Sequence, residues 1–143
     1  MKYEYNDEKP QQLLEKGEYV LEVTKADFGV SDGAKSKGCH NVKLTLVDEV
    51  NGVELQNTFT FPDDSVASGT AKFFRSQIDS FLKSTGFAKE KGQNVEITPE
   101  TLVGLRTWAL VIQESWESKD KTKKGVNNKI EAWILKPLPE RPF

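Results

Sequence analysis

Lysine is the residue type with the clearest chemical potential in this chain. Residues 117–129 (ESKDKTKKGVNNK) contain five lysines against two acids, Glu117 and Asp120. Residues 31–45 contain three more lysines against Asp32, although the whole chain has a formal net charge of −2. Positive charge confined to two segments of an acidic protein indicates a surface that meets a polyanion. The alternative is that these lysines only keep exposed hairpin tips soluble.

The groups that catalysis needs are scarce. His40 is the only histidine, and it adjoins the only cysteine, Cys39. Neighbours in an extended strand point to opposite faces, so these two do not pair as base and nucleophile, and two ligands are too few for structural zinc. Cys39 is interpreted as a small buried hydrophobe, and Asp63-Asp64 as helix-capping acids rather than a metal pair. With no phosphate-binding glycine motif either, we expect no enzymatic activity, cofactor or metal.

Length and composition indicate one folded domain. The chain has 143 residues, of which 36% are hydrophobic and 10% aromatic, enough for a single core. No run approaches the ~18 apolar residues of a membrane helix, and residues 1–12 lack the apolar region of a secretion signal. A single cysteine fits a reducing cytoplasm. The pI of about 5.5 differs from that of a typical basic DNA-binding domain, but single-strand binders with local basic grooves tolerate an acidic body.

Apolar periodicity predicts five strands and one main helix. The strands are expected at residues 18–30, 42–46, 53–61, 106–116 and 128–135, the helix at 68–85, and a short helical turn at 98–103. Asn51-Gly52 predicts a hairpin between the second and third strands, because this pair suits a type I′ turn. Residues 1–16 are read as a polar arm anchored by Leu13 and Leu14, residues 17–136 as the domain, and 137–143 as a proline-rich tail.

This order of elements matches the OB fold. In that fold, a five-stranded antiparallel β-barrel carries its helix between strands 3 and 4. We therefore predict an all-β, OB-fold-like barrel with one principal helix. The loops joining strands 1 and 2 and strands 4 and 5 flank the ligand face of the fold, and these are the two loops that carry the lysines here.

Four runs also resemble a phage-encoded family of uncharacterised proteins. They are GEYVLEVTKAD, KGCHNVKLTLVDEVNGVELQNTFTF, FFRSQIDSFLKSTGF and ITPETLVGLRTWALV, within residues 17–135. The shared features are a Gly-Glu-Tyr strand, a small basic loop, a helix that ends in glycine and a Leu-Val-Gly step. Members of this family are similar to single-stranded-DNA-binding proteins and are encoded beside replication and recombination functions. The resemblance implies the same context here, in the cytoplasm of a host cell.

Single-strand binding requires cations for the phosphates and exposed rings on which bases stack. The predicted phosphate contacts are Lys35, Lys37, Lys43, Lys119, Lys121, Lys123, Lys124 and Lys129, and the predicted stacking residues are Trp116 and Trp133, with Phe28 and His40 as further candidates. Strand parity assigns Tyr19, Phe59 and Phe61 to the core. The same parity predicts that Trp133 faces outward. It also predicts that Phe28 points away from the core, unless an intervening bulge reverses the alternation of that strand. Trp108 is left open.

The leading hypothesis is a non-sequence-specific single-stranded-DNA-binding protein for phage replication or recombination, with no membrane association. The alternative is an OB-like protein-interaction module that docks a replication, recombination or host factor through its arm and tail. Pro142-Phe143 resembles the Pro-Phe tip with which bacterial single-strand-binding proteins recruit partners, although here the preceding Glu140-Arg141 is neutral overall rather than acidic. The sequence leaves open whether the strand is DNA or RNA and whether the chain forms a homo-oligomer.

Overall fold

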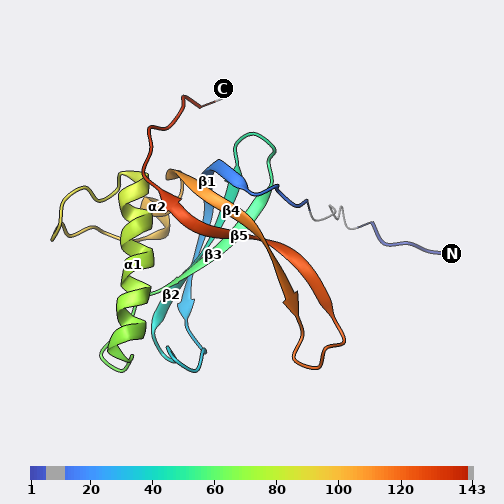
Figure 1. Cartoon of the computed structure of the whole chain (residues 1–143), viewed down its shortest axis with the longest axis horizontal. Helices are drawn as coiled ribbons and strands as arrows, with labels where there is room; N and C mark the ends of the chain where they lie inside the picture. Colours follow the sequence, from blue (N-terminus) through green and yellow to red (C-terminus); the bar gives the residue numbers. More distant parts are fainter. Residues whose placement is uncertain (6–11, 142–143) are drawn as a thin grey trace.

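One antiparallel sheet dominates the fold, with the strand order β3-β2-β1-β4-β5, and one long helix follows β3 (Figure 1). The computed structural model describes residues 1–5 and 12–141. The elements are β1 (Gly17–Val30), β2 (His40–Asp48), β3 (Glu54–Thr60), α1 (Ser68–Thr85), α2 (Pro99–Leu102), β4 (Arg106–Glu117) and β5 (Lys124–Ile134). This confirms the predicted OB-like, all-β fold with its principal helix between strands 3 and 4.

A bulge in β1 lets this strand serve two neighbours. β1 pairs with β4 over residues 17–22 and with β2 over residues 21–30. The register with β2 shifts after Val23, which leaves Thr24 as an extra residue. Such a bulge bends the strand and resets its side-chain alternation, so the next buried residue is Ala26.

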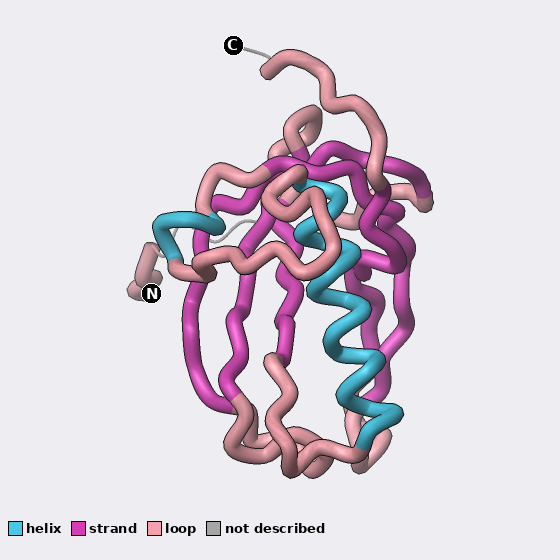
Figure 2. Tube along the Cα trace, turned by 90° about the vertical axis from the view of Figure 1, so that its left-hand side faces the viewer, coloured by secondary structure: helices cyan, strands magenta, loops and turns pink. Residues whose placement is uncertain are grey.

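An aromatic cluster joins the two edges of the sheet. The ring centroid of Phe59 on β3 lies 5.1 Å from that of Phe81 on α1 and 5.7 Å from that of Trp133 on β5. The rings of Phe81 and Trp133 meet edge to face at 4.9 Å, a favourable separation for aromatic pairs. Figure 2 shows α1 lying lengthwise along the strands. The barrel therefore closes between β3 and β5 through side chains, with α1 supplying the central ring.

The prediction that Trp133 faces outward is wrong. In the pairing of β4 with β5 the register shifts after Ile130, and Glu131 is left as an extra residue on β5. The bulge breaks the alternation on which the prediction depended. Ile130 and Trp133, three residues apart, therefore both pack against the core.

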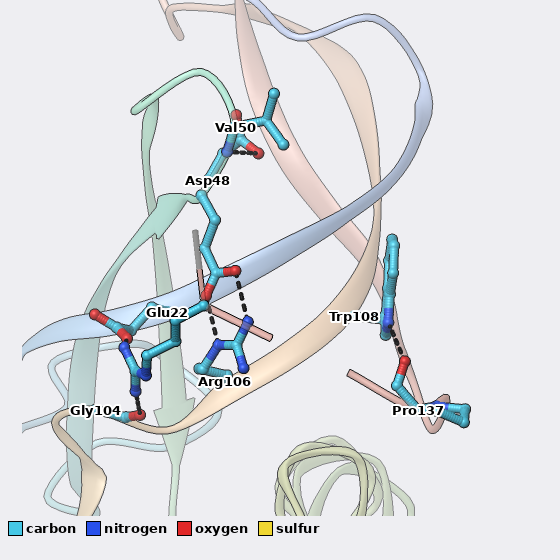
Figure 3. Close-up of polar contacts among 9 residues, drawn as sticks. Glu22, Asp48, Val50, Gly104, Arg106, Trp108 and Pro137 are labelled. Atoms are coloured by element: carbon cyan, nitrogen blue, oxygen red, sulfur yellow. Dashed lines mark hydrogen bonds and ion pairs between the residues drawn. The ribbon is translucent and has the colours of Figure 1, made fainter. Parts of the chain in front are cut away.

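The β2–β3 hairpin is present, but its turn is not the predicted type I′ form. Gly52 has a φ of 71°, whereas Lys121 is the one non-glycine residue with positive φ among residues 1–5 and 12–141. The buried Asp48 carboxylate accepts the N–H of Val50 at 3.4 Å (Figure 3) and that of Asn51 at 2.7 Å. The turn is thus shaped by the Asp48 side chain together with the left-handed Gly52, whereas Asn51 does not adopt the positive φ of a type I′ turn.

One leucine anchors the N-terminal arm to the barrel. Leu14 is buried, and its N–H donates to Oδ1 of Asn128 at 2.8 Å. Its carbonyl accepts Nε2 of Gln113 at 3.0 Å. Leu14 is therefore an anchor, as predicted, whereas Leu13 is 40% exposed.

The start of the proline-rich tail covers Trp108. Nε1 of Trp108 donates to the carbonyl of Pro137 at 2.9 Å (Figure 3), and Nζ of Lys136 lies 4.0 Å from the ring centroid. These contacts settle the alternatives for Trp108: it packs under the tail. Pro142-Phe143, the predicted recruiting tip, lies outside the described residues.

Trp133→Ala should lower the free energy of unfolding by about 3–5 kcal/mol, because large core aromatics cost that much to truncate. Urea unfolding measures this change, with Trp116→Ala as the matched control at a surface indole. A loss for Trp133→Ala no larger than that for Trp116→Ala would contradict the closing role of the cluster.

Candidate nucleic-acid interface

Both lysine-bearing loops lie at the same end of the barrel. The β1–β2 loop (residues 31–39) and the β4–β5 loop (residues 118–123) both lie along the lower edge of Figure 1, where α1 also begins. Cys39 is buried, as predicted, and packs with Val66 and Ala71. The β1–β2 loop is thereby held against the start of the helix. The fold thus places the two segments that the lysine pattern singles out at one end of the barrel.

The β4–β5 loop is shorter than the sequence indicates. The last strand is predicted to begin at residue 128, but β5 begins at Lys124, so Lys124 lies on the strand, as Lys129 does. The loop is closed by the N–H of Ser118, which donates to the carbonyl of Lys123 at 2.8 Å. Polar residues with no apolar alternation here extend the β4–β5 ladder.

Most of the predicted phosphate contacts are exposed cations without a carboxylate partner. Among the described residues, no ion pair within 4.0 Å involves Lys35, Lys37, Lys43, Lys119, Lys121, Lys123 or Lys124. Lys129 differs, since its Nζ lies 3.1 Å from Oε2 of Glu114. The hydrogen bond to Glu114 and the charge of that carboxylate raise the pKa of Lys129. The charge of Lys129 is therefore already compensated.

Asp120, the acid within the β4–β5 loop, is engaged by the loop itself. Its Oδ1 accepts Oγ of Ser118 at 2.6 Å, and the N–H and Oγ1 of Thr122 at 3.1 Å and 2.7 Å. These bonds, that of Ser118 first, lower the pKa of Asp120 to about 2. The carboxylate is ionised at neutral pH, yet hydroxyl and amide donors bind it rather than lysine ammonium groups.

Trp116 presents an indole on the surface of the hairpin. It is 42% exposed and lies directly opposite Gly125 in the β4–β5 ladder. A Cβ at Gly125 would stand 2.7 Å from Nε1 of Trp116, closer than packed atoms approach. The ring therefore rests on the glycine backbone, an arrangement that holds an aromatic side chain in place at an otherwise bare strand position.

Three more rings are exposed on elements that begin or end near the β1–β2 loop. The bulge at Thr24 reverses the side-chain alternation of β1, which is the case that the sequence left open for Phe28. Phe28 lies opposite buried Val42 but remains 45% exposed, because it is near the end of the strand. His40 is exposed at the start of β2. Phe73, which the sequence reasoning did not select, is 59% exposed on α1. The signal that could have identified Phe73 is its position on α1 outside the apolar stripe, where an aromatic side chain is left exposed.

Trp133 is not part of this surface. It packs with Phe59 and Phe81 in the closing cluster, so its predicted role in stacking bases has no geometric support. The exposed rings that the structure places on or beside the lysine-bearing hairpins are those of Trp116, Phe28 and His40.

No protein-family model matches this chain, and no curated protein matches it. Within residues 1–5 and 12–141, no group of three or more His, Cys, Asp or Glu side chains is arranged to hold a metal ion. No helix in the same part of the chain has the length and apolar content needed to cross a membrane. Function is therefore inferred from the loops and rings themselves.

Gly125→Ala should displace the Trp116 indole, because the added Cβ would collide with the ring. We expect a shifted indole N–H resonance for Trp116 and greater quenching of its fluorescence by acrylamide. Gly69→Ala is the matched control, since a Cβ there meets nothing within 4 Å. An unchanged Trp116 signal in Gly125→Ala would contradict the stacked arrangement.

Proposed function

We propose that this chain is a non-sequence-specific single-stranded-DNA-binding protein that supports replication or recombination, in the phage context that its sequence resemblance implies. The observation that carries the proposal is the β4–β5 hairpin. It combines a cationic tip with an exposed indole on one ribbon at the end of an OB-like barrel. The residues of this set are Trp116, Lys119, Lys121, Lys123 and Lys124.

Local charge supports a polyanionic ligand despite the acidic composition. Lys119, Lys121, Lys123 and Lys124 have no ion-pair partner among the described residues, so none of these ammonium groups has to give up a carboxylate contact before it meets a phosphate. The β1–β2 loop, which carries Lys35 and Lys37, lies at the same end of the barrel (Figure 1). Each phosphate neutralised releases counterions from the strand, which is the main source of affinity in binding of this kind.

The residue types favour binding that does not depend on sequence. Lysine–phosphate contacts position a nucleic acid but carry no base information. An indole accepts any base, because every base has a π-face, and such stacking requires a base that is not enclosed in a duplex. Trp116 is therefore assigned to stacking, with Phe28 and His40 as further candidates on β1 and β2.

Replacing Lys119, Lys121 and Lys123 together with alanine should weaken binding to an oligo-dT strand and flatten its salt dependence. For single strands the slope of log K against log salt changes by about 0.7 per lost contact, so a decrease of about 2 is expected. Fluorescence anisotropy titrations at several salt concentrations measure both quantities. The melting temperature should change little, because exposed lysines contribute about 0–1 kcal/mol.

The matched control is the triple variant of Lys83, Lys89 and Lys91, which removes the same charge from the end of α1 and the segment after it, away from both loops (Figure 1). This control should keep the wild-type slope. Equal losses in the two triple variants would reduce the site to an effect of net charge. No binding by the wild-type protein at low salt would reject the proposal in favour of the protein-interaction alternative.

Trp116→Ala should cost about 1–3 kcal/mol of binding free energy, the usual contribution of one stacked base. The salt slope should survive, because no phosphate contact has been removed. Poly-dT should quench the wild-type tryptophan fluorescence, and this quench should largely disappear in the variant. Trp116→Phe retains an aromatic face and should recover most of the affinity; normal binding by Trp116→Ala would assign the indole to hairpin packing alone.

A further inference from the structure

The β4–β5 loop contains an acid at the point where a phosphate-binding tip should avoid one. Asp120 lies between Lys119 and Lys121 in the sequence. By Coulomb's law alone its charge weakens the attraction of the tip for phosphate, although at exposed positions in water this effect is only on the order of twofold. The hydrogen bonds of Asp120 point to a different role.

Those bonds connect both sides of the loop. The N–H of Lys123 donates to Oγ of Ser118 at 3.0 Å, and that hydroxyl donates to Oδ1 of Asp120 at 2.6 Å. From the other side, both the N–H and the hydroxyl of Thr122 donate to the same oxygen. One carboxylate oxygen therefore determines the path of the backbone that carries the tip lysines.

The backbone at Lys121 provides a second, independent observation. Its φ is 61°, and its N–H donates to the carbonyl of Ser118 at 2.9 Å. The left-handed region is costly for a side chain of this kind, and glycine or asparagine is the usual residue there. Because this conformation is unfavourable for lysine, the rest of the loop must hold the backbone in place to keep it there.

We propose that Asp120 is a positioning residue for strand binding, which organises the β4–β5 loop so that its lysines meet the phosphates. This inference rests on the proposed function. An ordered tip binds with a smaller loss of loop and side-chain entropy than a disordered one. Removing the acid should therefore weaken the binding of a polyanion, although the net charge becomes more positive.

Three variants separate shape from charge in anisotropy titrations with the same oligo-dT. Asp120→Ala removes both the charge and the acceptor, and we expect roughly tenfold weaker binding. Asp120→Asn removes the charge but retains an Oδ1 acceptor for Ser118 and Thr122, so it should bind at least as well as the wild type. Glu117→Ala removes an equal charge from the adjacent strand end, and it should bind equally or up to about twofold more tightly.

Each outcome decides between the two roles. Tighter binding by Asp120→Ala, to the same extent as by Glu117→Ala, overturns the inference while leaving the proposed function intact. Weakening in Asp120→Asn equal to that in Asp120→Ala also overturns it, because the acceptor would then not matter. No binding by the wild type overturns both. Equal melting temperatures of the four proteins show that the barrel is folded in every titration.

Discussion

The contact among Phe59, Phe81 and Trp133 is the constraint on which the rest of the structure depends. β3 and β5 are the outer strands of the sheet, and without a seal between them the apolar core would be open to water. Helix α1 supplies that seal through the ring of Phe81. The side chain that closes the barrel on β5, Trp133, lies near the end of that strand. On the other side of β4, β1 pairs only with residues 106–111. The barrel can therefore be complete while the other half of the β4–β5 hairpin extends beyond it.

That extension explains why the candidate site is so densely bonded. A two-stranded ribbon is marginally stable on its own, and residues 112–117 of β4 pair only with β5. The ribbon is supported by the Trp116 ring on Gly125, by the Lys129–Glu114 pair and by the Asp120 loop. Trp116 thus has a structural role in the ribbon besides its proposed role in stacking bases. Lys129, a predicted phosphate contact, also takes part in this support through its pair with Glu114.

The order of strands and helix was predictable because it depends on period, and the burial of Phe59 followed from it. The burial of Cys39 followed from its residue type. Bulges were not predictable, since Thr24 and Glu131 differ in no obvious way from residues that pair normally. One extra residue reverses every later side chain on its strand, which is why the prediction for Trp133 failed. Polar strand extensions were missed for a related reason: the start of β5 pairs with β4 without an apolar face to reveal it.

The uneven distribution of charge along the chain, rather than an overall excess of lysine, makes the β4–β5 loop positive. The chain has 20 basic residues against 22 acidic ones. At the opposite end of the barrel, the Glu49 carboxylate accepts hydrogen bonds from Nε of Arg106 at 2.5 Å and from Nη2 of Arg106 at 2.8 Å (Figure 3). At the same end, Glu22 pairs with Arg141. At the lysine-bearing end, Asp120 takes hydroxyl and amide donors instead. Net charge and pI average over these two ends, so an acidic composition is compatible with a strongly cationic tip. What decides the charge that a ligand meets is the local sum of lysines and carboxylates, in which three lysines face one acid within residues 118–123.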